Sequence, residues 1–105
     1  MNILVSFLDR RPCEQIAWFA RRTLGFALDR FAPRIAEVAL RVRDQNGPRG
    51  GEDQRCTLAI KVVGGPDVWL EDTDAKAEKA VHRLARRAAR MLGRVAARRR
   101  REVRR

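Results

Sequence analysis

Hydrophobic positions follow two different periods along this chain, and each period predicts a different kind of element. Residues 13–31 carry apolar side chains at three- and four-residue steps, which is typical of an amphipathic helix with one buried stripe. The positions in this stripe are Ile16, Ala20, Leu24, Ala27, Leu28 and Phe31. Pro33 follows the stripe, as expected beyond the end of a helix. Residues 2–8, NILVSFL, are short and β-rich, so they predict a strand ahead of this helix.

The period then changes to two, which predicts strands with one buried face. In residues 35–44, valine and leucine alternate with alanine and arginine. In residues 55–63, the alternation is between Cys56, Leu58, Ile60 and Val62 on one side and Thr57, Ala59, Lys61 and Val63 on the other. Turn-forming residues fill positions 45–54, QNGPRGGEDQ, so we expect the two strands to pair as a hairpin. A second turn at residues 64–67 leads to a short further strand at residues 68–71.

A last helix is predicted from about Ala75 to beyond Val95, with Thr73 or Asp74 as its N-cap. The order of elements is therefore β-α-β-β-β-α. This order predicts an α+β two-layer sandwich, with a mostly antiparallel four-stranded sheet and both helices on one face.

The charge of the chain is concentrated at its C-terminal end. The 105 residues carry a formal net charge of +11. Residues 1–75 hold 11 basic and 11 acidic side chains, whereas residues 76–105 hold 13 basic and two acidic ones. We expect one folded domain over residues 1–97 and a disordered Arg-rich tail, RRRREVRR, over residues 98–105. Such an excess favours a phosphate-rich partner, nucleic acid above all.

Cations gather on one face of the last helix. At 100° per residue, seven of them fall within an arc of about 100°, opposite an apolar stripe. With Arg98 beyond them, they form the cationic face, the candidate RNA-binding residues Lys76, Lys79, Arg83, Arg86, Arg87, Arg90, Arg94 and Arg98. The apolar stripe consists of Ala77, Val81, Leu84, Ala88, Met91, Leu92 and Val95. A merely solvated face usually mixes charges, but Glu78 is the only acidic residue within the predicted helix, so phosphate binding is the favoured interpretation.

Three further side chains are candidate secondary RNA contacts. Trp18 and Arg22 are four residues apart and off the apolar stripe, so they can form a cation–π pair or offer a ring for base stacking. Ordinary partial burial of this pair is nevertheless the favoured interpretation. His82 lies at the border of the cationic face. Trp69 alternates out of phase with its neighbours, which predicts a position on the open face of the sheet.

The sequence offers few residues for catalysis. It has one histidine, one serine and no tyrosine. Cys13 and Cys56 show neither zinc spacing nor a disulfide framework, so we interpret them as reduced thiols acting as small apolar residues. We therefore expect no enzyme activity, no small-molecule substrate, no cofactor and no metal site. No apolar run is long enough to span a membrane and no signal peptide is evident, so a cytoplasmic location is expected.

Several motifs resemble a known family. The segment LGFALDRFAPRIAEVALRVRDQNGPRGGEDQRCTLAIKV, a Gly-rich turn and EDTD ahead of a basic helix closely resemble the short ribosome hibernation promoting factors, the RaiA/YfiA-like ribosome-associated translation inhibitors. The most specific parts are D-x-N-G-P-R-G-G at 44–51, the Arg55-Cys56 pair and Asp74. The resemblance covers residues 2–97.

The resemblance implies a non-enzymatic protein of stress or stationary phase. Family members bind ribosomal RNA of the small ribosomal subunit, in the channel for mRNA and tRNA, through basic residues on their helices. They thereby inhibit translation or protect idle ribosomes. Members with an added C-terminal domain also pair ribosomes into dimers. This chain resembles the short form, so we expect no such dimerisation domain.

A gapless match from Asp74 places the family's basic positions on Arg87, Arg90 and Arg94. The charge is retained at these three positions. Glu78 stands where the family often has a tyrosine, so base stacking by that ring is not carried over.

The alternative interpretation keeps the cationic face but not the ribosome. A general binder of structured RNA, or a nonspecific nucleic-acid-binding protein, would use the same residues, and the order of elements is also similar to double-stranded-RNA-binding domains. A membrane-surface module is disfavoured because the apolar stripe of the basic helix is needed for the core.

Overall fold

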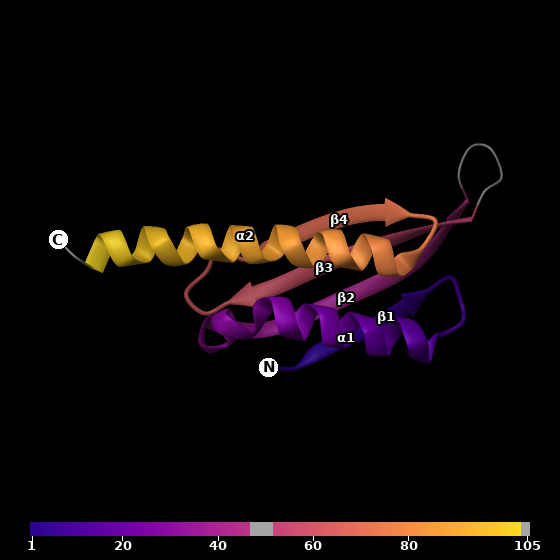
Figure 1. Ribbon diagram of the computed structural model, residues 1–105, viewed down its shortest axis with the longest axis horizontal. Coiled ribbons are helices and arrows are strands. Elements are labelled where there is room, and N and C mark those ends of the chain that lie inside the picture. Colours follow the sequence, from indigo (N-terminus) through magenta and orange to yellow (C-terminus); the bar gives the residue numbers. More distant parts are fainter. Residues whose placement is uncertain (47–51, 104–105) are drawn as a thin grey trace.

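A four-stranded sheet with two helices on one of its faces makes up the computed structural model, which describes residues 1–46 and 52–103 (Figure 1). The strand order is β1-β2-β3-β4. Strand β1 (Ile3–Leu8) runs parallel to β2 (Ile35–Asn46), and β3 (Glu52–Val62) and β4 (Val68–Asp74) continue the sheet in antiparallel fashion. The α+β class, the element order and the mostly antiparallel sheet that the sequence predicts are confirmed.

The parallel pair β1 and β2 needs a crossover, and α1 (Glu14–Leu28) provides it. The α-helix ends three residues before the predicted end at Phe31. The 3₁₀ helix η1 (Asp29–Arg34) follows and contains Pro33. Proline cannot donate an amide hydrogen bond and its ring clashes with the carbonyl four residues earlier, so the α-helical ladder cannot continue through this segment.

The central hairpin is longer than the turn-rich composition suggests. Gln45 pairs with Asp53 and Asn46 with Glu52, so both ends of the predicted 45–54 turn belong to strands. The 47–51 part of the family-like motif lies outside the described residues. Strand β4 likewise extends to Asp74, three residues beyond its predicted end. Ladder pairing with β3 explains this extension, because backbone hydrogen bonds do not depend on apolar side chains.

The predicted second turn joins β3 to β4. Gly64 and Gly65 have φ angles of 77° and 49°, a region that glycine adopts without steric cost. The Gly65 amide donates to the Val62 carbonyl at 2.9 Å, and the Val62 amide donates to Asp67 Oδ1 at 3.0 Å. These two hydrogen bonds stabilise the turn between β3 and β4.

The core lies between the sheet and the helices. It includes the predicted α1 positions Ile16, Ala20, Leu24 and Leu28, and Phe31 from η1. Seven residues of α2 are also buried, namely Ala77, Ala80, Val81, Leu84, Ala85, Ala88 and Leu92. Two other predictions for the apolar stripe are wrong: Met91 is 36% exposed and Val95 only half-buried. Leu92, beside Met91, is buried, so the covered part of the stripe narrows to one side of the helix in this region.

Helix α2 (Ala77–Val103) has 27 residues, which corresponds to about 40 Å at about 1.5 Å per residue. It continues through residues 98–103, for which the sequence predicts a disordered tail. The cationic face therefore extends along a helical surface that projects from the body of the protein (Figure 1). Within the described residues, no helix combines the length and the apolar character needed to cross a membrane.

Candidate nucleic-acid interface

The start of α2 is anchored by Asp74. Its Oδ1 accepts a hydrogen bond from the backbone amide of Lys76 at 2.9 Å. Neither predicted residue is the N-cap: α2 begins at Ala77, and the carbonyl of Lys76 accepts from the first helical amides, those of Lys79 and Ala80. Asp74 instead fixes the backbone that leads into the helix, and Thr73 is exposed. The carboxylate of Asp74 also places negative charge near the positive end of the helix dipole, which stabilises the first turn.

Arg83 joins α2 to the end of β4. Its Nε and Nη2 donate to the two carboxylate oxygens of Asp72 at 2.7 and 3.1 Å, and its Nη1 donates to Asp74 Oδ2 at 3.0 Å. Nη2 also donates to the Thr73 carbonyl at 3.2 Å. The hydrogen bond from Arg83 lowers the pKa of Asp72. The Lys76 amide, followed by Arg83, lowers the pKa of Asp74. The guanidinium that we expected to bind phosphate thus already has two carboxylate partners.

Arg87 is also engaged within the protein. Its Nη1 donates to the backbone carbonyl of Glu71 at 3.0 Å, and its side chain is half-buried. The Glu71 carboxylate forms an ion pair with Arg55 of β3. Arg83 and Arg87 therefore hold the helix against β4, and the two residues are less available to an external phosphate than their helical positions suggest.

The other six predicted cations remain open to solvent. Each has an exposed side chain, and no acceptor among the described side chains pairs with any of them. These open cations of the cationic face are Lys76, Lys79, Arg86, Arg90, Arg94 and Arg98. The last four recur at four-residue steps and form one row along α2, which continues onto the projecting end of the helix. Such a row suits contacts with several phosphates of one nucleic-acid strand.

A mostly apolar groove of about 660 Å³ lies between the two helices and adjoins this row. It brings together all three predicted secondary contacts, because Trp18 and Arg22 line it from α1 and His82 lines it from α2. The favoured partial burial is wrong, because Trp18 is 61% exposed and Arg22 is exposed. The cation–π alternative is confirmed: the Arg22 guanidinium carbon lies 5.2 Å from the centre of the Trp18 ring. Arg86 belongs both to the groove and to the row of open cations.

Phe26 is a groove residue that the site prediction missed. Its side chain is 90% exposed although it is fully apolar. The signal was present in the sequence, because Trp18, Arg22 and Phe26 follow one another at four-residue steps and therefore share one side of α1. The groove thus alternates aromatic and cationic side chains, a combination suited to stacked bases and neighbouring phosphates.

The two cysteines are free thiols, as predicted, and they differ in environment. Cys56 is buried under α2, with its Sγ 4.0 Å from the Ala77 carbonyl oxygen. Burial, followed by the negative charge of Asp72, raises the pKa of Cys56 to about 11. Cys13 is half-buried. Among the described residues, no three histidine, cysteine or acidic side chains are grouped to hold a metal ion.

Two solved structures share this architecture. A ribosomal subunit interface protein from Coxiella burnetii superposes with a TM-score of 0.75 at 12% sequence identity, covering 92% of this chain and 99% of that one. The N-terminal domain of Protein Y from Thermus thermophilus gives a TM-score of 0.68 at 20% identity, covering 90% and 99%. The fold is that of these two proteins. It is the fold that the family resemblance implied. Neither a protein-family model nor a curated protein matches the sequence.

Proposed function

We propose that this protein binds ribosomal RNA of the small ribosomal subunit, within the channel for mRNA and tRNA, and so inhibits translation or protects idle ribosomes under stress. The observation that carries the proposal is the row of open cations on α2 beside an aromatic groove. Support comes from the fold, which is shared with a ribosomal subunit interface protein. The motifs at 44–51, Arg55-Cys56 and Asp74 point to the same family.

The proposed mechanism is occupancy of the channel. Guanidinium and ammonium groups on α2 neutralise RNA phosphates, and release of their counterions drives binding. Arginine dominates the row, which favours bidentate contacts with phosphate oxygens. Unpaired bases of the RNA would stack against Trp18 and Phe26 in the groove. No covalent step is required.

Co-sedimentation with purified small and large ribosomal subunits tests this proposal. Joint replacement Arg86→Glu and Arg90→Glu should abolish pelleting with the small subunit, because it reverses the charge at the centre of the row. Neither residue has a partner among the described side chains, so the fold should be retained. The matched control is Arg11→Glu with Lys61→Glu, which makes the same charge change at exposed positions away from α2. This control should still pellet.

Full retention of small-subunit binding by a folded Arg86→Glu, Arg90→Glu protein would refute the site. Equal pelleting with both subunits and with naked RNA would favour the second candidate function, a general binder of nucleic acid. One feature supports that alternative: the open cations suit phosphate contacts, and such contacts carry no sequence information by themselves. Comparing affinities for subunits, duplex RNA and duplex DNA at one salt concentration separates the two functions.

A further inference from the structure

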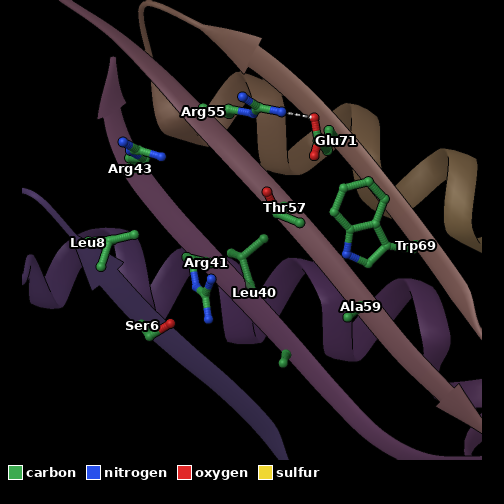
Figure 2. Close-up of a pocket in the computed structure, with 11 residues that line it drawn as sticks. Ser6, Leu8, Leu40, Arg41, Arg43, Arg55, Thr57, Ala59, Trp69 and Glu71 are labelled. Atoms are coloured by element: carbon green, nitrogen blue, oxygen red, sulfur yellow. Dashed lines mark hydrogen bonds and ion pairs between the residues drawn. The ribbon is translucent and has the colours of Figure 1, made fainter.

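The face of the sheet that the helices leave uncovered carries rows of side chains across all four strands (Figure 2). The strand register defines three neighbouring rows. The first row is Leu4, Ala39, Ala59 and Trp69. The second row is Ser6, Arg41, Thr57 and Glu71. The third row is Leu8, Arg43, Arg55 and Thr73. None of these side chains belongs to the cationic face of α2, which lies on the other layer.

The first row forms a stacking surface. Two alanines lie between Leu4, which is 50% exposed, and Trp69, which is 62% exposed. The small side chains leave a shallow hollow of about 370 Å³ on the sheet, and Figure 2 shows the Trp69 ring at its side. An exposed indole beside a floor of methyl groups offers a flat apolar surface to a planar ring. Base–aromatic stacking uses this arrangement.

The next two rows add positive charge beside the hollow. Arg41 is exposed, and none of the described side chains accepts a hydrogen bond from it. Arg43 is bound through Nε to Asp9 at 3.1 Å, with both side chains more than half exposed, so this pair contributes little. Arg55 uses Nη2 for Glu71. The remaining nitrogens of Arg43 and Arg55 have no partner among the described residues.

Arg43 and Arg55 also lie directly opposite each other on β2 and β3. Like charges in this position destabilise a sheet, so an anion placed between the two guanidinium groups would relieve their repulsion. A phosphate fits this requirement, because arginine binds its oxygens in bidentate fashion. The stacking surface is the first row and the anion position lies in the third, so the row that carries Arg41 separates them. A base in the hollow and a phosphate at the anion position therefore belong to a segment of more than one nucleotide.

We infer that the open sheet face binds a single-stranded RNA segment, with a base stacked on Trp69 and phosphates held by Arg41 and between Arg43 and Arg55. A duplex is unsuited, because its bases are already stacked inside the helix and cannot reach the indole. The hydroxyl groups of Ser6 and Thr57 flank Arg41 in the second row and can bond to a ribose 2′-hydroxyl. The inference does not rest on the proposed ribosomal function, since it uses a different layer of the molecule.

The fluorescence of Trp69 gives a site-specific test. In a Trp18→Phe protein, Trp69 is the sole tryptophan, and a single-stranded oligouridine of about eight nucleotides should quench it to saturation. Arg41→Ala should weaken this binding by about tenfold or more. Lys61→Ala is the matched control, because Lys61 is an exposed cation of the same face that lies outside the hollow. It should change the affinity less than about twofold.

The aromatic requirement is tested with a fluorescently labelled oligouridine. Trp69→Leu should lower its affinity for the sheet face by roughly 5- to 150-fold, whereas Trp69→Phe should retain most of it. Absence of quenching, equal quenching by the corresponding RNA duplex, or equal effects of Arg41→Ala and Lys61→Ala would each overturn the inference.

The charge reversal on α2 separates this inference from the proposed function. In the Trp18→Phe protein that also carries Arg86→Glu and Arg90→Glu, quenching of Trp69 should persist even where small-subunit binding is lost. Loss of quenching in that folded protein would show that the signal comes from RNA held by α2, and it would refute a separate sheet-face site.

Discussion

Arg83 is the residue whose role the structure changes most. On helical geometry alone it occupies the centre of the cationic face, but its guanidinium donates to Asp72, Asp74 and the Thr73 carbonyl. These bonds connect α2 with the last residues of β4. The acidic end of β4 thus balances part of the charge of the basic helix, and Arg83 acts mainly within the protein.

This arrangement predicts an acid-sensitive contact. The lowered pKa values of Asp72 and Asp74 mean that, near pH 4, the unfolded chain binds more protons than the folded one. The stabilisation is therefore complete above the ordinary aspartate pKa of 3.8 and is lost as the pH falls through the lower folded values. Urea unfolding across this range measures it. In Arg83→Gln the loss below pH 4 should be smaller, and an unchanged pH profile would contradict the role of Arg83.

The buried thiol of Cys56 leads to a second prediction. The thiolate is the reactive form, and a pKa of about 11 leaves very little of it at neutral pH. In a Cys13→Ser protein, Cys56 should therefore react with a thiol reagent only when the core opens, and urea should accelerate the reaction strongly. Rapid reaction in the native protein would show that the contact between β3 and α2 is open.

At the scale of elements, α2 combines a buried stripe with the cationic face. Like charges at four-residue steps repel one another and destabilise a helix slightly. Core packing by residues such as Leu84 and Leu92, the bond from the Lys76 amide to Asp74 and the Arg83 ion pairs offset this repulsion. The helix can therefore keep a row of open cations available for a partner.

Gly93 lowers the stability of this helix. A Cβ atom at this position would lie 3.9 Å from the ζ carbon of Phe31, which is ordinary van der Waals contact. Glycine in a helix interior costs about 0.5–1 kcal/mol relative to alanine. Gly93→Ala should raise the free energy of unfolding by about that amount, as measured by urea denaturation. A lower stability would mean that η1 and α2 pack more tightly at this point than the structure shows.

At the scale of the whole molecule, the two layers carry different surfaces. The helix layer presents the open cations and the aromatic groove, and the sheet layer presents Trp69 and three arginines. If both proposed sites bind RNA, the protein can contact two RNA segments at once. This property would suit a position inside a channel lined by RNA.

The open cations make binding by α2 dependent on salt. If about six phosphates are neutralised, the logarithm of the association constant should fall with the logarithm of salt concentration at a slope of about −4 to −5. Titrations of small subunits at several salt concentrations measure this slope. Arg86→Gln with Arg90→Gln should make it less steep by about 1.5–2, and a slope near zero for the unmodified protein would exclude an electrostatic mechanism.

Much of the fold follows from local patterns. Alternation in residues 35–44 and 55–63 identifies the buried faces of β2 and β3 correctly, because a strand exposes successive side chains to opposite sides. The apolar stripe of α1 is also predicted correctly, because Ile16, Ala20, Leu24 and Leu28 are buried. Boundaries are less predictable: β2 and β3 extend through polar residues, since ladder hydrogen bonds are made by the backbone.

The candidate site, like the fold, can be predicted from the sequence only in part. Sequence periodicity alone determines that the cations of α2 share one face and that Trp18 and Arg22 can pair, since both depend on residues three or four positions apart. Only the tertiary structure decides that Arg83 is occupied by carboxylates 9 and 11 residues away and that His82 faces Trp18 across a groove. These contacts depend on how α2 packs against β4 and α1, and local spacing contains no information about the relative placement of elements distant in the chain.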